Sequence, residues 1–328
     1  MGEPRTGIVI TGWSAVSRFG IGRAAFADGI RHGRTPDDRG VPDFDPRAAL
    51  GKKNTRSMDR ATGLALVALR ELETTPADTT GVVLGTTLGS VPDMVDFTRA
   101  SLTGARPFHV NPGQFPNVVM NRTAAQCAIW YGLKGPNATV ATGQVAGLSA
   151  LAYARRVLAA GRAGQMVCGA AEARTDARSW LASNREGDSR QPHGEGAVML
   201  MVCQDEALPP LARVVAVESR VCRDGDIRGA LAGCVTDMLA RADVRPEEIT
   251  RIEPSAGHHP EQERDCLRAL LGDSRISPLS TVDRLGDTGA VSALFQIGSA
   301  LTAPGTVLIT SVERDGIVAC ALLTINHR

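Results

Sequence analysis

Residues 135–148 read GPNATVATGQVAGL, and they carry most of what the chain says about its own fold. The stretch starts with a turn, continues as a short apolar strand and enters a helix near Val145. A residue at such a strand-to-helix elbow lies at a helix N-terminus, where backbone N–H groups and the helix dipole favour an anion and lower the pKa of a thiol. The position suits a cysteine nucleophile, but it holds Gln144, whose amide can only donate and accept hydrogen bonds. We therefore predict the architecture of a covalent catalyst without its nucleophile.

The composition is that of a large α/β protein. The chain has 328 residues, of which 43% are hydrophobic and only 4% are aromatic, so it can bury one large core or two fused ones. The net charge of +1 gives no sign of a nucleic-acid partner. The first residues lack the apolar core of a signal peptide, and no apolar run is long enough to span a bilayer. We therefore expect a cytoplasmic protein without a membrane partner.

The cysteines and histidines do not form a recognisable metal site. No C-x-x-C pair occurs, and most cysteines have apolar neighbours, which predicts reduced, buried thiols. Adjacent His258 and His259 have no cysteine or carboxylate at ligand spacing, so we expect solvated or locally hydrogen-bonded rings. A shifted loop that brings one of these rings to Gln144 is the alternative. No metal and no other cofactor is expected.

Strands and helices alternate along the chain, as they do in α/β proteins. Apolar runs predict strands at residues 7–11, 81–85, 138–142, 165–170, 197–203, 213–221, 251–253, 307–312 and 317–325. Helical periodicity predicts helices at residues 61–72, 92–102, 116–131, 145–160, 227–242, 260–271 and 288–301. Polar segments at 33–45 and 184–193 predict loops. Two such series meet near residue 208, which indicates an internal duplication with halves at residues 1–208 and 209–328.

Four short motifs, taken in order, resemble the β-ketoacyl synthase family of the thiolase superfamily. They are IVITGWSAVS at residues 8–17, the elbow at 135–144, CGAAE at 168–172 and GEGA at 194–197. Each motif is weak alone, but their order and spacing agree with the family over nearly the whole chain. The resemblance implies an α/β, thiolase-like five-layer αβαβα fold. In that fold two mixed sheets enclose the helices at residues 145–160 and 288–301.

The catalytic positions that the resemblance implies all carry other residues here. Gln144 stands at the nucleophile, and Ser255 stands at the first histidine. Val282 replaces the lysine, and Asp287 replaces the second histidine. Claisen condensation needs a thiolate to carry the acyl chain and imidazole N–H groups to polarise the malonyl thioester. We therefore expect no catalytic residue and no condensation by this chain.

Residues 140–151, VATGQVAGLSAL, resemble the elbow of the chain length factors, the non-catalytic β subunits of type II polyketide ketosynthases. The resemblance implies a heterodimer with a catalytic ketosynthase α subunit, and a growing chain carried by an acyl carrier protein. The strand at 138–142 would be the edge that pairs with the partner. Shortened segments near residues 33–57 and 174–193 favour a subclass that serves a reducing, polyene-forming system over an aromatic one.

In that family, side chains at the dimer interface set the length of the product. The resemblance places them on the helix at residues 91–102 and on the helix at 116–129. The candidates for the substrate tunnel are Met94, Phe97, Thr98, Phe115, Met120 and Ala124.

Two other functions stay open. One is an enzyme with altered chemistry on the same scaffold, such as a malonyl-ACP decarboxylase or an acyltransferase that uses Gln144 to stabilise an oxyanion. The other is a homodimeric scaffold that binds acyl carrier proteins.

Overall fold

The computed structural model describes residues 7–33, 39–72, 76–184, 192–204 and 210–326. Within them the strands form one mixed sheet of ten, in the order β4-β3-β5-β6-β1-β7-β10-β9-β8, with β2 paired to β1. The N-terminal half contributes β1 (Ile8–Ser17), β2 (Gly20–Ile21), β3 (Gly81–Gly85), β4 (Asn137–Val140), β5 (Gln165–Glu172) and β6 (Gly196–Cys203). The C-terminal half contributes β7 (Ala212–Val221), β8 (Arg251–Glu253), β9 (Gly305–Val312) and β10 (Ile317–Ile325).

Helices connect most of these strands. The N-terminal half contains α1 (Arg23–Arg31), α2 (Pro46–Leu50), α3 (Arg60–Arg70), α4 (Val91–Thr103), α5 (Phe115–Val118), α6 (Arg122–Tyr131), α7 (Ala146–Ala159) and α8 (Asp176–Ser183). The C-terminal half contains α9 (Ile227–Ala242), α10 (Pro260–Leu271), α11 (Thr281–Leu285) and α12 (Ser292–Ala300). Within the described residues, no helix is both long enough and apolar enough to cross a membrane.

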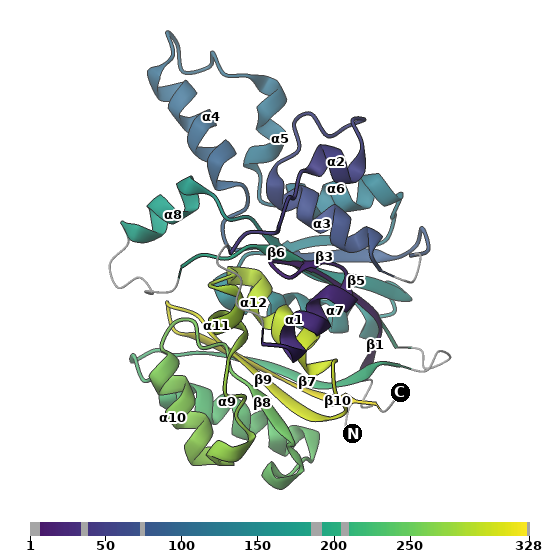
Figure 1. The fold of residues 1–328 in the computed structure, drawn as a ribbon, viewed down its shortest axis with the longest axis vertical. Helices are drawn as coiled ribbons and strands as arrows, with labels where there is room; N and C mark the ends of the chain where they lie inside the picture. Colours follow the sequence, from purple (N-terminus) through teal and green to yellow (C-terminus); the bar gives the residue numbers. More distant parts are fainter. Residues whose placement is uncertain (1–6, 34–38, 73–75, 185–191, 205–209, 327–328) are drawn as a thin grey trace.

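The elements stack in five layers, as the sequence predicts (Figure 1). One hydrophobic cluster joins α3 and α6 to one face of the N-terminal strands, and another joins α9 and α10 to one face of the C-terminal strands. Between the two groups of strands, α7 and α12 pack against both. The strands alternate accordingly, since Met199 faces the outer helices while Val198 and Leu200 face the central ones. The two central helices are those at the predicted positions.

The two predicted sheets are joined to each other. Strand β1 pairs with β6 along most of its length, but Ile8–Ile10 also pairs with residues 212–214 of β7. Pairing therefore continues from the first group of strands into the second, because the start of β1 is bonded on both of its edges. The first strand is also longer than predicted. A shift of register between Ile10 and Gly12 lets it continue past the glycine at which the prediction ends.

The single helix predicted over residues 116–131 is wrong. The structure divides it into α5 and α6, with Val119 in an extended conformation between them. Asn117 is buried just before the break, and its Nδ2 donates to Ser57 O at 2.9 Å and to Asp93 Oδ1 at 3.3 Å. These tertiary bonds fix the chain where two β-branched valines follow, and such residues have weak helix propensity. Periodicity also predicts none of the helices α1, α2, α8 and α11.

Candidate functional site

The elbow predicted around Gln144 is present. Strand β4 is followed by a 3₁₀ turn, Gly143–Val145, and then by α7. Gly143 has a φ of +63°, a left-handed conformation that glycine adopts without strain. Gln144 is only 2% exposed. It therefore occupies a fixed, buried point at the start of a central helix.

Two carboxylates hold Gln144 in place. Its backbone N–H donates to Glu313, and its side-chain Nε2 donates to Asp287 Oδ1 at 3.1 Å. Gly257 lies against the amide, since a Cβ there would collide with it. The amide of Gln144 thus connects α7 with the start of the second central helix through a hydrogen bond.

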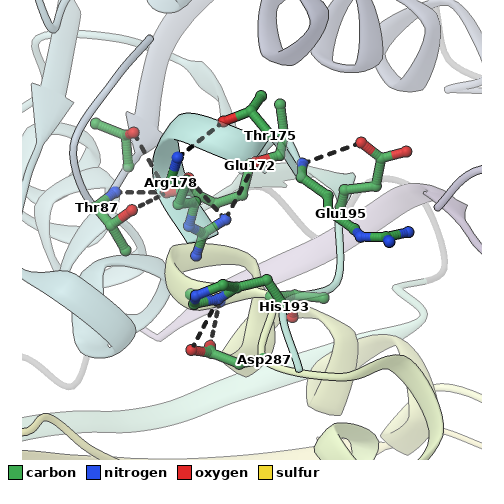
Figure 2. A network of polar contacts seen from close by, with 12 residues as sticks. Thr87, Glu172, Thr175, Arg178, His193, Glu195 and Asp287 are labelled. Carbon is green, nitrogen blue, oxygen red and sulfur yellow. Dashed lines mark hydrogen bonds and ion pairs between the residues drawn. The ribbon is translucent and has the colours of Figure 1, made fainter. Parts of the chain in front are cut away.

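Asp287 is buried just before α12. Its Oδ1 also accepts from Gly289 N–H at 2.9 Å, and its Oδ2 lies 3.6 Å from Nδ1 of His193 (Figure 2). Burial by itself would raise the pKa of Asp287, but His193, the Arg178 guanidinium and the Gly289 N–H together hold that pKa well below its usual range. Asp287 is therefore ionised at neutral pH.

A second buried carboxylate, Glu172, also faces Arg178. Its Oε2 lies 3.4 Å from Arg178 Nη1, and its Oε1 accepts from the backbone N–H and hydroxyl of Thr87 at 2.5 and 2.9 Å (Figure 2). Burial outweighs these contacts, so the pKa of Glu172 lies above its usual range. Arg178 is thus flanked by two acids whose pKa values move in opposite directions.

Ser255 and Val282 do not join Gln144 and Asp287. The hydroxyl of Ser255 donates to Glu263 Oε2 at 2.9 Å and accepts from Val312 N–H at 3.3 Å, so both bonds serve the local packing. Val282 is buried in the short helix α11. Of the four positions expected from the motif comparison, the structure brings only Gln144 and Asp287 into contact.

A cavity of about 370 Å³ opens beside Gln144. Charged and polar groups line it together with Leu88 and Leu181. His258 and Gln144 both line it, while His259 Nε2 lies 3.3 Å from Arg314 O, a local contact of the kind expected for these rings. The polar lining residues include Thr87, Gln144, Arg178, His193, His258, Asp287, Glu313, Arg314 and Asp315.

Several of these residues were not among the site residues predicted from the sequence, including Arg178, His193 and Glu313. His193 directly precedes the GEGA motif, and Glu313 directly follows the strand predicted at residues 307–312. Arg178 had no such signal, because it lies on α8, which periodicity does not predict. Its place beside Asp287 follows only from the tertiary fold.

No thiol serves this cavity. None of the seven cysteines lines it, and all of them except Cys222 are buried. They are Cys127, Cys168, Cys203, Cys222, Cys234, Cys266 and Cys320. Burial raises the pKa of Cys127 to about 12 and that of Cys266 to about 11, which makes both poor nucleophiles. Among the described residues there is no cluster of three metal-ligating side chains.

Comparison with known families matches the beta-ketoacyl synthase N-terminal domain to residues 9–196, more than half of the chain. The chain belongs to the beta-ketoacyl synthase family. It is 33% identical over 140 residues to 3-oxoacyl-[acyl-carrier-protein] synthase 2 of Vibrio harveyi, covering 40% of this chain and 34% of that protein. It is 28% identical over 189 residues to the protein of that name from Synechocystis sp., covering 51% of this chain and 45% of that protein. The match thus spans less than half the length of these relatives.

Solved structures of ketosynthases share the fold over almost the whole chain. The ishigamide ketosynthase/chain length factor is 40% identical, with a TM-score of 0.91, and the match covers 98% of this chain and 100% of that chain. A chain of the AntDE:AntF complex, a type II PKS acyl-carrier protein with its ketosynthase, is 18% identical with a TM-score of 0.80, over 99% and 100%. The first match confirms the predicted resemblance to type II ketosynthases and chain length factors. The second supports the fold alone.

The tunnel residues predicted for this chain lie on and around α4, α5 and α6. The rings of Phe97 and Phe115 are in contact, with centroids 6.0 Å apart. Phe115 is 57% exposed and Met120 is 46% exposed, and Met120 lies beside Gly89. The other three differ in burial: Met94 is half-buried, Thr98 is exposed, and Ala124 is fully buried against α3 and the sheet.

An apolar surface surrounds these residues. Strand β4 lies at the end of the strand order and pairs only with β3 among the described residues, so its other edge is open. Helices α4 and α5 project from one end of the molecule (Figure 1). We call the exposed apolar side chains of this region the α4–α6 surface: Leu102, Phe108, Phe115, Val119, Met120 and Ile129. Exposed apolar groups of this size are costly to leave in water.

Proposed function

We propose that this chain is a chain length factor, the non-catalytic β subunit that pairs with a ketosynthase α subunit in type II polyketide biosynthesis. The elbow carries the proposal. It retains the strand-to-helix turn that suits a nucleophilic cysteine, but its central residue is a buried glutamine. The side-chain amide of that glutamine is hydrogen-bonded to the ionised Asp287. An amide cannot form the thioester that condensation requires. The match to the ishigamide ketosynthase/chain length factor supports the same assignment.

The charges around the elbow weigh against a decarboxylase or an acyltransferase. Such an enzyme would need Gln144 or its backbone N–H to stabilise an oxyanion. The backbone N–H already donates to Glu313, and the side-chain amide donates to Asp287. Two carboxylates next to the reacting oxygen would repel the negative charge that develops there.

The α4–α6 surface and the open edge of β4 are the proposed contact with the α subunit. An unpaired strand edge next to exposed Phe115, Met120 and Ile129 is unfavourable in water, so a partner that covers both would be stabilising. Obligate interfaces of this kind bury more than about 2,000 Å². A ketosynthase that presents its own edge strand would continue the sheet across the interface.

Co-expression tests the partnership. The chain should be poorly soluble alone and should form a 1:1 or 2:2 complex when it is produced with a ketosynthase that has an intact catalytic cysteine. Sizing and native mass spectrometry measure the stoichiometry. A soluble homodimer that does not bind the ketosynthase would favour the scaffold alternative. Turnover by this chain alone would favour the enzymatic one.

We further propose that Met94, Phe97, Phe115 and Met120 form the block that ends the product chain, with Thr98 and Ala124 beside it. Removing a large side chain from a packed wall costs roughly 2–5 kcal/mol where the site cannot collapse. In a tunnel the substrate can refill the space, and burial of each further two-carbon unit contributes up to about 1.6 kcal/mol of binding free energy. Trimming the block should therefore lengthen the product while synthesis continues.

Mass spectrometry of carrier-bound products from the α/β pair provides the readout for this block. Each of the four bulky residues is changed to Ala, and Leu270→Ala serves as the control because Leu270 is a partly exposed leucine on α10, in the opposite outer layer. We expect longer products from at least one of the four and an unchanged length from the control. Unchanged length in all four, with activity retained, would remove these helices from the tunnel.

A further inference from the structure

The backbone N–H at the elbow is already bonded within the chain. Gln144 N–H donates to the carboxylate of Glu313, 169 positions further along the sequence. Gly143 permits this approach, because a Cβ at that position would collide with the same carboxylate. Glu313 therefore lies where an acyl-transfer scaffold would receive the oxygen of a reacting carbonyl.

A rigid hairpin places Glu313 there. Residue 313 follows β9, and the short loop to β10 is closed by Glu313 N–H to Ile317 O at 2.7 Å and by Gly316 N–H to Glu313 O at 3.1 Å. The two strands are paired along their whole length, from residue 305 to residue 325. The sheet thus fixes the backbone of residue 313 beside the elbow, and the side chain of Glu313 spans the remaining distance to Gln144 N–H.

We propose that Glu313 is an internal stopper that closes the Gln144 cavity to thioesters and to anionic groups. It satisfies the N–H that a thioester carbonyl would need, and its charge disfavours a second anion. The chain then carries two separate blocks against acylation at the elbow. The first is the missing thiol at Gln144, and the second is the occupied N–H. This inference concerns the elbow alone and does not depend on the identity of any partner.

The other charges around the cavity determine which control is needed. Arg178, Arg314, His193 and His258 line it together with Asp287 and Asp315, so loss of any negative charge could change the reactivity of a group inside. Asp315 provides the match for Glu313. It lies two residues further along in the same loop, is exposed, and lines the same cavity. A change of Asp315 removes an equal charge and leaves the bond from Glu313 to Gln144 intact.

The test uses a thiol introduced as a probe. Gln144→Cys is made alone, with Glu313→Gln, and with Asp315→Asn. Each protein, free or with its α subunit, is treated with iodoacetamide, which is neutral, or with iodoacetate, which is anionic. Peptide mass spectrometry then follows alkylation at position 144 separately from the native cysteines. The ratio of the two rates cancels effects that act on the thiol alone.

We expect Glu313→Gln to raise the iodoacetate rate relative to the iodoacetamide rate by about tenfold, and Asp315→Asn to change the ratio less than about twofold. An unchanged ratio for Glu313→Gln, or an equal change for Asp315→Asn, would overturn the proposal. Glu313→Ala is the second variant, since it removes both the charge and the bond. Circular dichroism establishes that each protein is folded. Failure of the chain to pair with a ketosynthase would refute the proposed function but leave this result intact.

Discussion

The two central helices begin with similar turns, but different carboxylates cap those turns. Residues 142–145 read TGQV before α7, and residues 288–291 read TGAV before α12. Each stretch forms a 3₁₀ turn that contains a glycine with positive φ, +63° at Gly143 and +54° at Gly289. The first turn of α7 also packs against the second of these 3₁₀ turns, since a Cβ on Gly147 would lie 2.8 Å from Ala290 O. We propose that this repeat marks the duplication into residues 1–208 and 209–328, although the boundary itself falls outside the described residues.

The difference lies in the carboxylate to which each turn donates a hydrogen bond. Gly289 N–H donates to Asp287, two residues earlier, at 2.9 Å, whereas Gln144 N–H donates to Glu313 from a remote hairpin. Both carboxylates line the cavity, but Asp287 is only 5% exposed, whereas Glu313 is half-buried. A local cap forms with its own turn, but a remote cap can be lost without changing the turn. A single substitution at residue 313 would therefore remove the cap of the first elbow.

The largest effect should come from the carboxylate of the second elbow. We expect Asp287→Asn to lower the free energy of unfolding by about 3–5 kcal/mol, because His193 and Arg178 lose a buried charged neighbour. Glu313→Gln, at the first elbow, should cost only about 1 kcal/mol. Urea unfolding at neutral pH, followed by circular dichroism, measures both variants. Equal losses would contradict the distinction between the two caps.

Acid should reduce the stabilisation that Asp287 provides. The pKa of Asp287 in the folded protein lies below its ordinary value, so its contribution to stability is complete above the unfolded pKa of about 3.9. The contribution falls as the pH drops from there through the folded pKa. The gap in unfolding free energy between the wild type and Asp287→Asn should therefore narrow below about pH 4. A gap that widens in acid would mean that Asp287 is not ionised in the folded protein.

The glycines should rank next. An alanine in the left-handed region costs about 1–2 kcal/mol, so Gly143→Ala and Gly289→Ala should both destabilise the protein. At Gly289 the new Cβ would also meet Arg178 and the methyl of Thr87, which are held in place by Glu172. We expect roughly 1–3 kcal/mol more there, because buried groups cannot move aside. At Gly143 the obstacle is the carboxylate of Glu313, which can rotate away.

The double variant Gly143→Ala/Glu313→Ala sharpens this comparison. Its loss should be smaller than the sum of the two single losses, because the collision disappears with the carboxylate. Unfolding free energies of the two single variants and the double variant provide the measurement. Strict additivity would mean that Glu313 does not approach Gly143 in solution.

The sequence predicted what local pattern and motif order determine, and missed what tertiary contacts decide. Helices α9 and α10 and strands β8 and β10 have the predicted bounds, because their apolar periodicity is regular and turn residues flank them. The break at Asn117 could not be predicted, since it depends on Ser57 and Asp93. The site around Gln144 was predicted only in part. The motifs aligned both residues with catalytic positions, but the remote cap by Glu313 has no local signature.

The smallest effect concerns the threonine that precedes each glycine. Thr288 and Ser292 share a hydrogen bond of 2.9 Å between their hydroxyls, and both are buried. Thr142 donates to Ser149 at 3.1 Å, but these two residues are only half-buried, so water can replace the lost partner. Thr288→Val should therefore cost about 1–3 kcal/mol, because it leaves a buried hydroxyl without that bond, and Thr142→Val about 0.5–1 kcal/mol. The matched pair of urea titrations tests whether the second elbow is the drier one. A larger loss for Thr142→Val would reverse the order and place the more tightly closed turn beside Gln144.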